Sequence, residues 1–436
     1  MELLALLLFL SIFLLLLYGY PVAFTLGGIS MLYALLFVES SSLSALPARI
    51  MGVMRNDVLL AVPLFVFMGI MLEKSGLAAR LLDTMAMLFG RLRGGLAVSV
   101  VIVGALLAAS TGIVGATVIT MGLISLPTML RRGYDPRLAT GTIASAGTLG
   151  QIIPPSIVLV LLGSVLNVSV GRLFAASFLP GLLLVGCYVL YILLYAFFNP
   201  DKAPAIPEAE IRAFRADRFW SKLVQAFVLP LLLILAVLGS IFGGLATPTE
   251  AAAVGALGAT LLTVSQGKFS LGILGEVARA TTHLTVMVFF ILLGATTFTF
   301  VFRELGGDRY LVDLIAESAL SPLVFLLLVM LVVFVAGFFI DFIEIIFIIV
   351  PVVAPVFVAY DMDLIWIGVL LALNLQTSFL TPPFGFSLFY LKGVAPPEVT
   401  TGHLYRGILP FLAIQILFLL LILLYPGILN WVSFGA

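Results

Sequence analysis

Two proline pairs in a strongly apolar chain mark places where polar groups could do chemistry. The first pair lies in Gly147–Ser156, which reads Gly-Thr-Leu-Gly-Gln-Ile-Ile-Pro-Pro-Ser, and no charged residue occurs between Arg137 and Arg172. Adjacent prolines remove backbone donors, so a helix breaks here and leaves polar backbone groups without helical partners. At membrane depth such backbone is tolerated only where protein or a water-filled cavity satisfies it. We therefore expect a binding site at this break.

A second copy of the pattern is Asn374–Pro383, which reads Asn-Leu-Gln-Thr-Ser-Phe-Leu-Thr-Pro-Pro. Pro382 follows Pro154 by 228 positions. Matching broken helices in two halves are typical of secondary transporters, whose site lies between the repeats. Half-helix N-termini favour anionic groups, whereas unwound carbonyls and side-chain oxygens bind Na⁺. The pattern predicts places for an anionic substrate group and for Na⁺.

The candidate site residues lie at these two breaks and at two predicted hairpin tips. In the first half they are Ser110, Thr111, Gly112, Thr148, Gly150, Gln151 and Pro154. In the second half they are Gly337, Asp341, Asn374, Gln376, Thr377, Ser378, Thr381 and Pro382. For a single Ser, Thr or Gly the simpler interpretation is close helix packing in lipid. The paired Pro-Pro breaks favour the functional interpretation.

Asp341 and Glu344 are carboxylates between apolar runs, three residues apart and hence on one helical face. A carboxylate at membrane depth is costly and by default predicts a functional site. The alternative is that both are solvated near an outer mouth and only support the structure. Whether Glu344 is functional stays open at this point. Na⁺ is the expected coupling ion, and no cofactor is expected.

The composition predicts a polytopic membrane protein. Of its 436 residues 63% are hydrophobic and 10% are charged, where a soluble domain would have about a quarter charged. Basic and acidic residues balance at 21 each, which gives no reason to expect a nucleic-acid partner. Cys187 is the single cysteine, so no disulfide forms within the chain. Membrane lipid is the expected surrounding.

The sequence motifs give little support for an enzymatic function. The sequence has no Gly-x-x-x-x-Gly-Lys-Ser/Thr loop and no His/Cys cluster with metal-binding spacing. An intramembrane protease would need a Ser/His pair or a second aspartate facing Asp341. A structural membrane subunit remains an alternative, but it does not explain the duplicated breaks.

The gaps between charged residues predict an all-α fold of two repeats joined by a cytoplasmic linker. The first repeat, 1–198, comprises scaffold 1–73, amphipathic arm helix 75–93, re-entrant hairpin 94–130, broken helix 136–166 and span 174–198. The linker is 199–222. The second repeat, 223–436, comprises scaffold 223–302, arm helix 307–317, hairpin 320–359, broken helix 364–391 and span 409–431. Five spans per repeat, an odd count, predict that the second repeat is inverted.

The basic residues predict the orientation of the chain. With the N-terminus outside, 16 of the 21 lysines and arginines are cytoplasmic. Positively charged loops stay inside, so both termini are expected on the periplasmic face. The first hairpin then opens from the cytoplasm and the second from outside.

Four groups of short motifs are distinctive when taken together. They are Ala109–Gly112 with Gly115–Thr117, Gly133–Asp135 followed by Ala139–Gly141, Gly147–Ser156, and Gly337–Asp341 with Thr381–Pro383. With these motifs the chain resembles the large membrane subunit, or M subunit, of tripartite ATP-independent periplasmic (TRAP) transporters. The similarity covers essentially the whole chain. It implies Na⁺-driven uptake of an organic acid, such as a dicarboxylate, keto acid or sugar acid, across the bacterial inner membrane. It also implies two partners, a small four-helix membrane subunit (Q) and a periplasmic substrate-binding protein (P).

The resemblance further implies an elevator-type carrier. In that mechanism Gly95–Gly163 and Leu320–Leu391 would slide as one body against the remaining spans, with the two arm helices as tethers. Rocking about a fixed site is the mechanistic alternative. A stand-alone Na⁺/dicarboxylate carrier without a binding protein is the alternative for the function.

Overall fold

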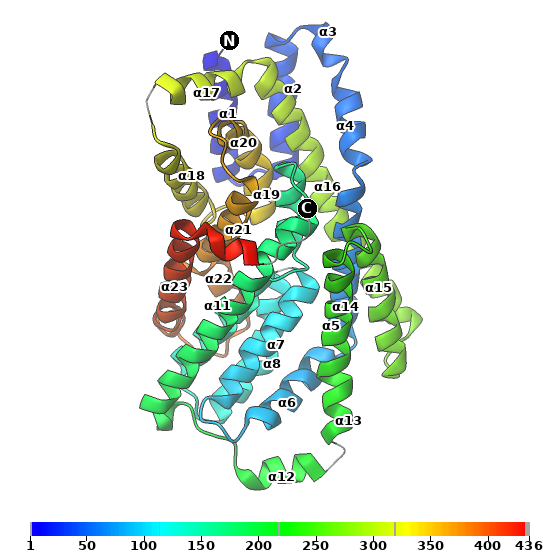
Figure 1. Ribbon diagram of the computed structural model, residues 1–436, viewed down its shortest axis with the longest axis vertical. Helices are drawn as coiled ribbons and strands as arrows, with labels where there is room; N and C mark the ends of the chain where they lie inside the picture. Colours follow the sequence, from blue (N-terminus) through cyan, green and yellow to red (C-terminus); the bar gives the residue numbers. More distant parts are fainter. Residues whose placement is uncertain (1, 113, 217–218, 318–319, 432–436) are drawn as a thin grey trace.

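The computed structural model describes residues 2–112, 114–216, 219–317 and 320–431, and within these ranges all regular structure is helical. The molecule is elongated, with α1 (Glu2–Leu17) at one end of its long axis and α12 (Glu208–Ala216) at the other (Figure 1). Lipid offers no hydrogen-bond partners, so segments this apolar must satisfy their backbone internally. The all-α class expected from the sequence is confirmed.

The first half has helices at the positions predicted for the arm, the hairpin and the broken helix, and we keep these names for them. Its elements after α1 are α2 (Val22–Phe37), α3 (Ser40–Leu43), α4 (Leu46–Met54), η1 (Asp57–Leu60), α5 (Ala61–Lys74), α6 (Leu77–Phe89), α7 (Gly95–Thr111), α8 (Val114–Arg131), α9 (Pro136–Thr148), η2 (Leu149–Gln151), α10 (Ile157–Val165) and α11 (Val170–Phe198). Gly94 and Gly112 bound α7 in the left-handed conformation, with φ of 78° and 62°. Glycine adopts this conformation without the steric penalty of a Cβ atom.

The second half is similar in its element order. Its elements are α13 (Phe219–Leu223), η4 (Val224–Val228), α14 (Leu229–Phe242), α15 (Pro248–Ser265), α16 (Leu271–Glu304), α17 (Gly307–Glu317), α18 (Pro322–Ala336), α19 (Phe342–Ile348), α20 (Val350–Ala359), α21 (Leu364–Leu380), α22 (Phe386–Val394), α23 (Thr401–Leu424) and η5 (Pro426–Trp431). The axes of α19 and α20 bend by 50° at their junction. The second hairpin is therefore less regular than the first.

Three predicted boundaries need correction. The last span runs over Thr401–Leu424 and not 409–431, because Thr400 caps its start and Pro426 cannot continue the helix. The span predicted at 174–198 begins at Val170, where the Ser169 hydroxyl accepts a hydrogen bond from the Arg172 N–H. The linker 199–222 is partly helical, since it contains α12 and the first residues of α13.

The linker is attached to the foot of the first hairpin by backbone hydrogen bonds. The Gly94 N–H donates to the Ala203 carbonyl at 2.9 Å, and the Ile206 N–H donates to the Gly90 carbonyl at 2.8 Å. On α12, Glu210 accepts a hydrogen bond from Arg132 at 3.1 Å, and this bond lowers the pKa of Glu210. The linker thus connects the two halves and also packs beneath α7 and α8.

The two hairpins lie toward opposite ends of the molecule. Figure 1 shows α7 and α8 in the lower half, with α6 beneath them, and α18 to α20 in the upper half, with α17 above. This placement is what two inverted repeats would produce. The inversion itself stays a prediction.

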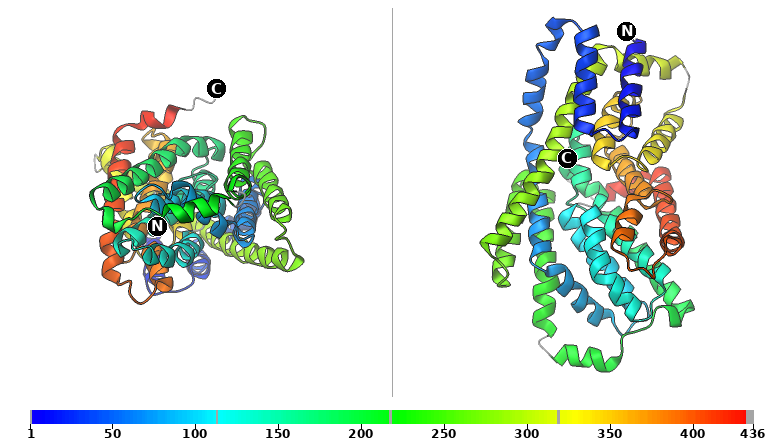
Figure 2. Two further views of the ribbon diagram at one scale, coloured as in Figure 1. Left: turned by 90° about the horizontal axis from the view of Figure 1, so that it is seen from below. Right: turned by 180° about the vertical axis from the view of Figure 1, so that it is seen from behind.

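Helices of the two halves interlock. Helix α2 packs along α16 and α5 packs along α15, whereas α9 packs along α23 and α11 contacts α21. Both views of Figure 2 show that α16, the long helix of 34 residues, leaves the compact part of the molecule at its start. We call α1 to α5 with α14 to α16 the frame, and α7 to α11 with α18 to α23 the block.

The frame and block together are apolar and long enough for several membrane crossings. Among the described residues, five helices could cross a membrane alone, and up to seven spans result if each of two bent pairs counts as one. Five further apolar helices are shorter, with 10–17 residues. A short apolar helix spans only if its ends are extended or the bilayer thins.

Candidate functional site

The first hairpin tip and the first break pack against each other. Gly112 ends α7, and a Cβ atom at its position would lie 2.9 Å from the Ile157 side chain, just after the break. Gly150 lies directly against the backbone carbonyl of Ala108 on α7, with no space for a side chain. Ser110 and Thr111 belong to the last turn of α7, but their side chains lie outside the described residues. The glycines therefore allow close approach of tip and break.

We expect Gly150→Ala to lower the free energy of unfolding by about 1–3 kcal/mol, because the added methyl group overpacks the contact with α7. A lower melting temperature of the purified chain in detergent would be the signal. Gly393→Ala is the matched control, because a Cβ atom there would have nothing within 4 Å. Equal melting temperatures for the two variants would contradict the close contact.

The first break contains a buried amide without a partner. Thr148 donates its hydroxyl proton to the Ser145 carbonyl at 2.9 Å, within its own helix. Gln151 is fully buried, and neither atom of its side-chain amide has a hydrogen-bond partner. Pro154 is joined to Pro155 by a cis peptide bond. Gln151 is thus the one predicted residue of this break whose side-chain polar atoms are available for a bound water or ion.

The second break has the same form. Pro382 and Pro383 are joined by a cis peptide bond between α21 and α22. The hydroxyls of Thr377, Ser378 and Thr381 donate to carbonyls of their own helix, three or four residues earlier, at 2.7–2.8 Å. The hydroxyl protons of these three predicted ligands are therefore used within their own helix, whereas their oxygen lone pairs can still bind a cation. Their role as ligands stays a prediction.

Two amides of α21 reach other elements. Asn374 donates to the Met330 carbonyl on α18 at 2.7 Å, which ties the second break to its hairpin. Gln376 donates from Nε2 to the Thr148 hydroxyl at 3.3 Å, and its Oε1 atom has no partner. Gln376 and Thr148 are 228 positions apart. The two breaks therefore meet through residues at corresponding places of the two halves.

Asp341 begins α19 at the tip of the second hairpin. One carboxylate oxygen accepts a hydrogen bond from the Phe342 N–H at 2.6 Å. Gly337, at the other side of this tip, packs directly on the Ser378 side chain. Glu344 lies in the first turn of α19, where a carboxylate is favoured by the helix dipole. That position explains Glu344 without a ligand.

A cavity of about 260 Å³ joins both hairpin tips to the frame. The first hairpin contributes Val114 and Gly115, and the second contributes Asp341, Phe342 and Ile343. Phe379 of α21, Tyr390 of α22 and Ile157 of α10 complete the block side, and the frame side consists of Val62, Val66, Leu284, Met287 and Val288. Asp341 is the only charged residue among these. An anionic oxygen among apolar walls suits a small cation, because burying it unpaired is costly.

Of the thirteen candidates whose side chains the structure describes, only Asp341 lines this cavity. Sequence reasoning missed Phe379, Ile157 and Tyr390. One feature of the sequence could have indicated Tyr390 as a site residue, namely its position eight residues after Pro382 on the helix that follows the break.

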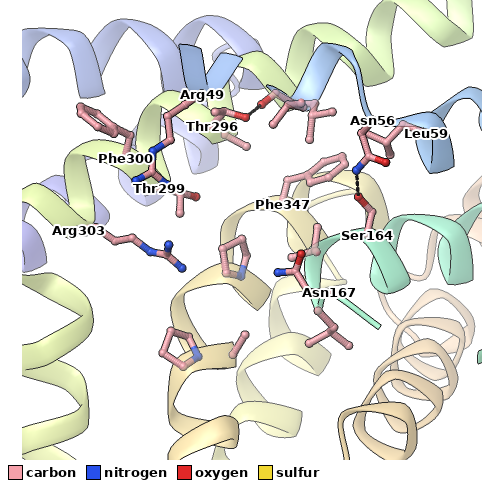
Figure 3. A pocket seen from close by; sticks show the side chains of 18 of the residues that line it. Arg49, Asn56, Leu59, Ser164, Asn167, Thr296, Thr299, Phe300, Arg303 and Phe347 are labelled. Carbon is pink, nitrogen blue, oxygen red and sulfur yellow. Dashed lines mark hydrogen bonds between the residues drawn. The ribbon is translucent and has the colours of Figure 1, made fainter. Parts of the chain in front are cut away.

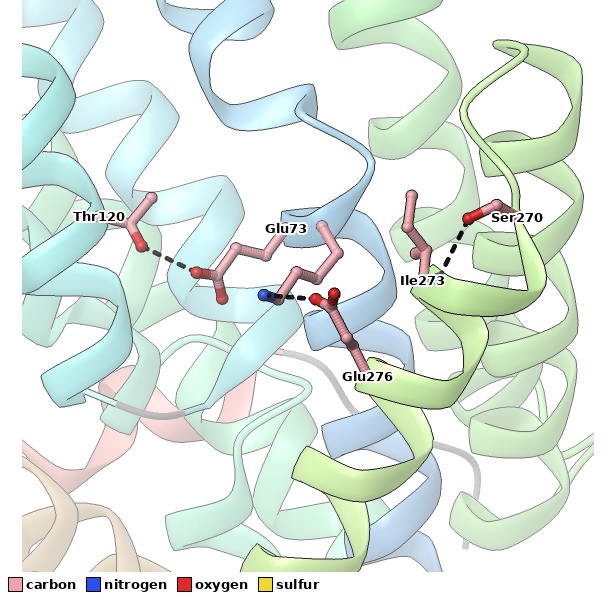
Figure 4. Close-up of polar contacts among 6 residues, drawn as sticks. Glu73, Thr120, Ser270, Ile273 and Glu276 are labelled. Carbon is pink, nitrogen blue, oxygen red and sulfur yellow. Dashed lines mark hydrogen bonds and ion pairs between the residues drawn. The ribbon is translucent and has the colours of Figure 1, made fainter.

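A further polar contact connects frame and block on the side of α6 (Figure 4). The Thr120 hydroxyl on α8 donates to the Glu73 carboxylate on α5 at 2.8 Å. The next residue, Lys74, forms an ion pair of 3.0 Å with Glu276 on α16, and this pair lies within the frame. Glu73 therefore remains free of Lys74 and holds the first hairpin against α5.

Comparison with known proteins identifies relatives over nearly the full length. Residues 9–428 match the model of the family described as "Tripartite ATP-independent periplasmic transporter, DctM component". The C4-dicarboxylate TRAP transporter large permease protein DctM of Pseudomonas aeruginosa is 34% identical over 402 residues, covering 92% of each chain. The sialic acid TRAP transporter large permease protein SiaM of Vibrio cholerae is 32% identical, covering 94% of this chain and 93% of its own.

A solved structure is similar in fold. The YdaH transporter of Alcanivorax borkumensis superposes with a TM-score of 0.65 at 16% identity, covering 96% of this chain and 98% of its own. The sequence relatives are transporter permeases and not enzymes. The family match spans both hairpins and both breaks, and the chain therefore belongs to the DctM component family of tripartite ATP-independent periplasmic transporters.

Proposed function

We propose that this chain is the large permease of a Na⁺-coupled uptake system for an organic acid in a bacterial inner membrane. The observation that carries the proposal is the cavity in which Asp341 and both hairpin tips face the frame. Relatives are named for C4-dicarboxylates, sialic acid and ectoine, all of which carry a carboxylate group. The shared chemistry supports a carboxylate-bearing solute.

Na⁺ coupling is supported by the kind of oxygen atoms near the tips. Asp341 supplies a carboxylate, and the broken helices supply carbonyl groups without helical partners. Among the described residues no group of three or more His, Cys, Asp or Glu side chains could hold a metal ion. A weakly held monovalent ion with carbonyl ligands fits such a site better than a transition metal.

The packing supports an elevator movement of the block against the frame, with one change to the sequence-based prediction. That prediction left the spans after each broken helix with the stationary part. However, α11 packs on α7, α10 and α21, and α23 packs on α9 and α21. A moving body that left them behind would have to break these contacts, so α11 and α23 belong to the block.

The arm helices are placed as tethers between the two bodies. On one side α6 contacts α7 and α8 of the block and α5 of the frame, and on the other α17 contacts α20 of the block and α16 of the frame. The distribution of basic residues supports a cytoplasmic position for α6 and periplasmic termini. Rocking about a fixed site would require no such hinged arms at both ends.

We expect uptake to require two partners, a periplasmic binding protein and a small membrane subunit, because the family is described as tripartite. Proteoliposomes with a Na⁺ gradient, tested with succinate, sialic acid and ectoine, provide the measurement. Uptake should appear only when all three proteins are present. Robust Na⁺-driven uptake by this chain alone would instead assign it as a stand-alone carrier, and uptake without dependence on Na⁺ would refute the coupling.

A further inference from the structure

A second cavity lies apart from the Asp341 cavity and is positively charged. It has a volume of about 720 Å³ and opens between the frame and the block (Figure 3). Arg49 of α4 and Arg303 of α16 line it from the frame, together with Glu304. Two guanidinium groups and one carboxylate leave a net charge of about +1 in the cavity at neutral pH.

Neither arginine is neutralised by a neighbour. Among the described residues no carboxylate forms an ion pair with Arg49 or Arg303. The Arg49 guanidinium lies over the Phe300 ring, 5.9 Å from its centre, which positions the charge and leaves its donors free. In Figure 3 the Arg303 side chain points into the open space of the cavity, and the Arg49 side chain lies beside Phe300 and Thr299. Unpaired guanidinium groups in a cleft attract and hold anions.

The remaining polar groups of the cavity are uncharged. Thr299 of α16 and Asn167 beyond α10 line it, and their side chains have no hydrogen-bond partner within the described residues. Asn56 of the frame donates to the Ser164 hydroxyl of the block at 3.3 Å, which closes one edge. Guanidinium, amide and hydroxyl groups together can bind a carboxylate and hydroxyl groups of a small organic acid.

The cavity also adjoins the hairpin that carries Asp341. Phe347 of α19 and Pro351 of α20 line the charged cavity, whereas Asp341 and Phe342 line the smaller one. The two cavities thus follow one another along one hairpin arm. With the N-terminus outside, the charged cavity lies on the outer side.

We propose that this cavity is a receiving site, in which the carboxylate of the transported acid binds between Arg49 and Arg303 before it reaches the Asp341 cavity. The inference rests on the proposed uptake of an organic acid. The two arginines belong to the frame, so the receiving site stays in place when the block moves. It raises the local concentration of the anion at the block without taking part in Na⁺ binding.

The first test measures charge in the cavity without transport. Thr299→Cys is placed in a Cys187→Ser background, and the purified chain is labelled with an anionic or a cationic methanethiosulfonate reagent. When Arg49→Gln and Arg303→Gln are combined, we expect the labelling rate of the anionic reagent, relative to that of the cationic reagent, to fall about tenfold. A cleft lined by positive charge concentrates anions, and the double variant removes that charge. Succinate or sialic acid should slow labelling only when both arginines are present. Arg309→Gln, an exposed arginine on α17 outside the cavity, is the control.

The second test measures uptake by the complete three-protein system. Arg49→Gln and Arg303→Gln should each raise KM by about tenfold with little change in kcat, and Arg→Lys should restore part of the loss. If labelling at position 299 shows no charge selectivity and carboxylates do not slow it, the receiving site is overturned, even if the three-protein system takes up the acid. Protection by the binding protein alone would also overturn it, since the arginines would then form a docking surface. Charge-selective labelling with carboxylate protection but no Na⁺-driven uptake would uphold the anion site and refute the proposed function.

Discussion

Replacing Asp341 by Asn should shift the Na⁺ dependence of uptake to higher concentration by about 30-fold or more. Loss of one charged partner at a desolvated site costs about 2 kcal/mol or more, and Asp341 is the only charged residue among the described residues that line its cavity. Asn keeps the shape of the side chain and still caps a helix, so folding should be little affected. Initial uptake rates of the three-protein system against Na⁺ concentration provide the measurement.

A matched control separates cation binding from helix capping. Asp363 begins α21 in the same way, with a carboxylate oxygen that accepts a hydrogen bond from the Ile365 N–H at 2.8 Å, but it is solvent-exposed and lines neither cavity. Asp363→Asn should leave the Na⁺ dependence unchanged. Glu344→Gln should do the same if Glu344 only stabilises the first turn of α19. An unchanged Na⁺ dependence in Asp341→Asn would assign Asp341 to capping alone.

The sequence indicated where the chain breaks because proline has a local, strong effect on the backbone. Both Pro-Pro pairs occur between helices, and Gly112 occupies a left-handed turn at the first tip. Asp341 was recognisable because a carboxylate stands out in an apolar run. Each of these signals requires no knowledge of tertiary contacts.

The direction of the side chains could not be predicted in the same way. Thr377 and Ser378 are predicted ligands from their type, and the structure adds that their hydroxyl protons are donated to carbonyls of their own helix, which leaves only the oxygen lone pairs for a cation. Phe379 and Tyr390 line the cavity, but an aromatic residue carries no special signal in a chain with 35 phenylalanines and 12 tyrosines. Side-chain chemistry limits what a residue can bind, whereas packing decides whether it is available.

The sequence also could not predict which helices pack against each other. A membrane helix that is apolar on every side gives no indication of which face meets protein and which meets lipid. The assignment of α11 and α23 to the block therefore needed the packing of α9 and α21. The contact between Glu73 and Thr120, 47 residues apart, equally needed the tertiary structure. This contact gives the most direct test of movement.

Cross-linking position 73 to position 120 should abolish uptake, because it joins the frame to the first hairpin of the block. Glu73→Cys and Thr120→Cys, combined with Cys187→Ser, would be treated with a short bifunctional methanethiosulfonate, which joins the two thiols through reducible disulfides, since the native side chains meet through a hydrogen bond of 2.8 Å. Reduction of the link should restore uptake.

The matched control is Lys74→Cys with Glu276→Cys. The native side chains form an ion pair of 3.0 Å, but this pair connects α5 to α16 within the frame. That link should leave uptake near the level of the uncross-linked protein. An elevator requires α8 to slide past α5, so normal uptake with position 73 joined to position 120 would refute it, even with the family assignment intact.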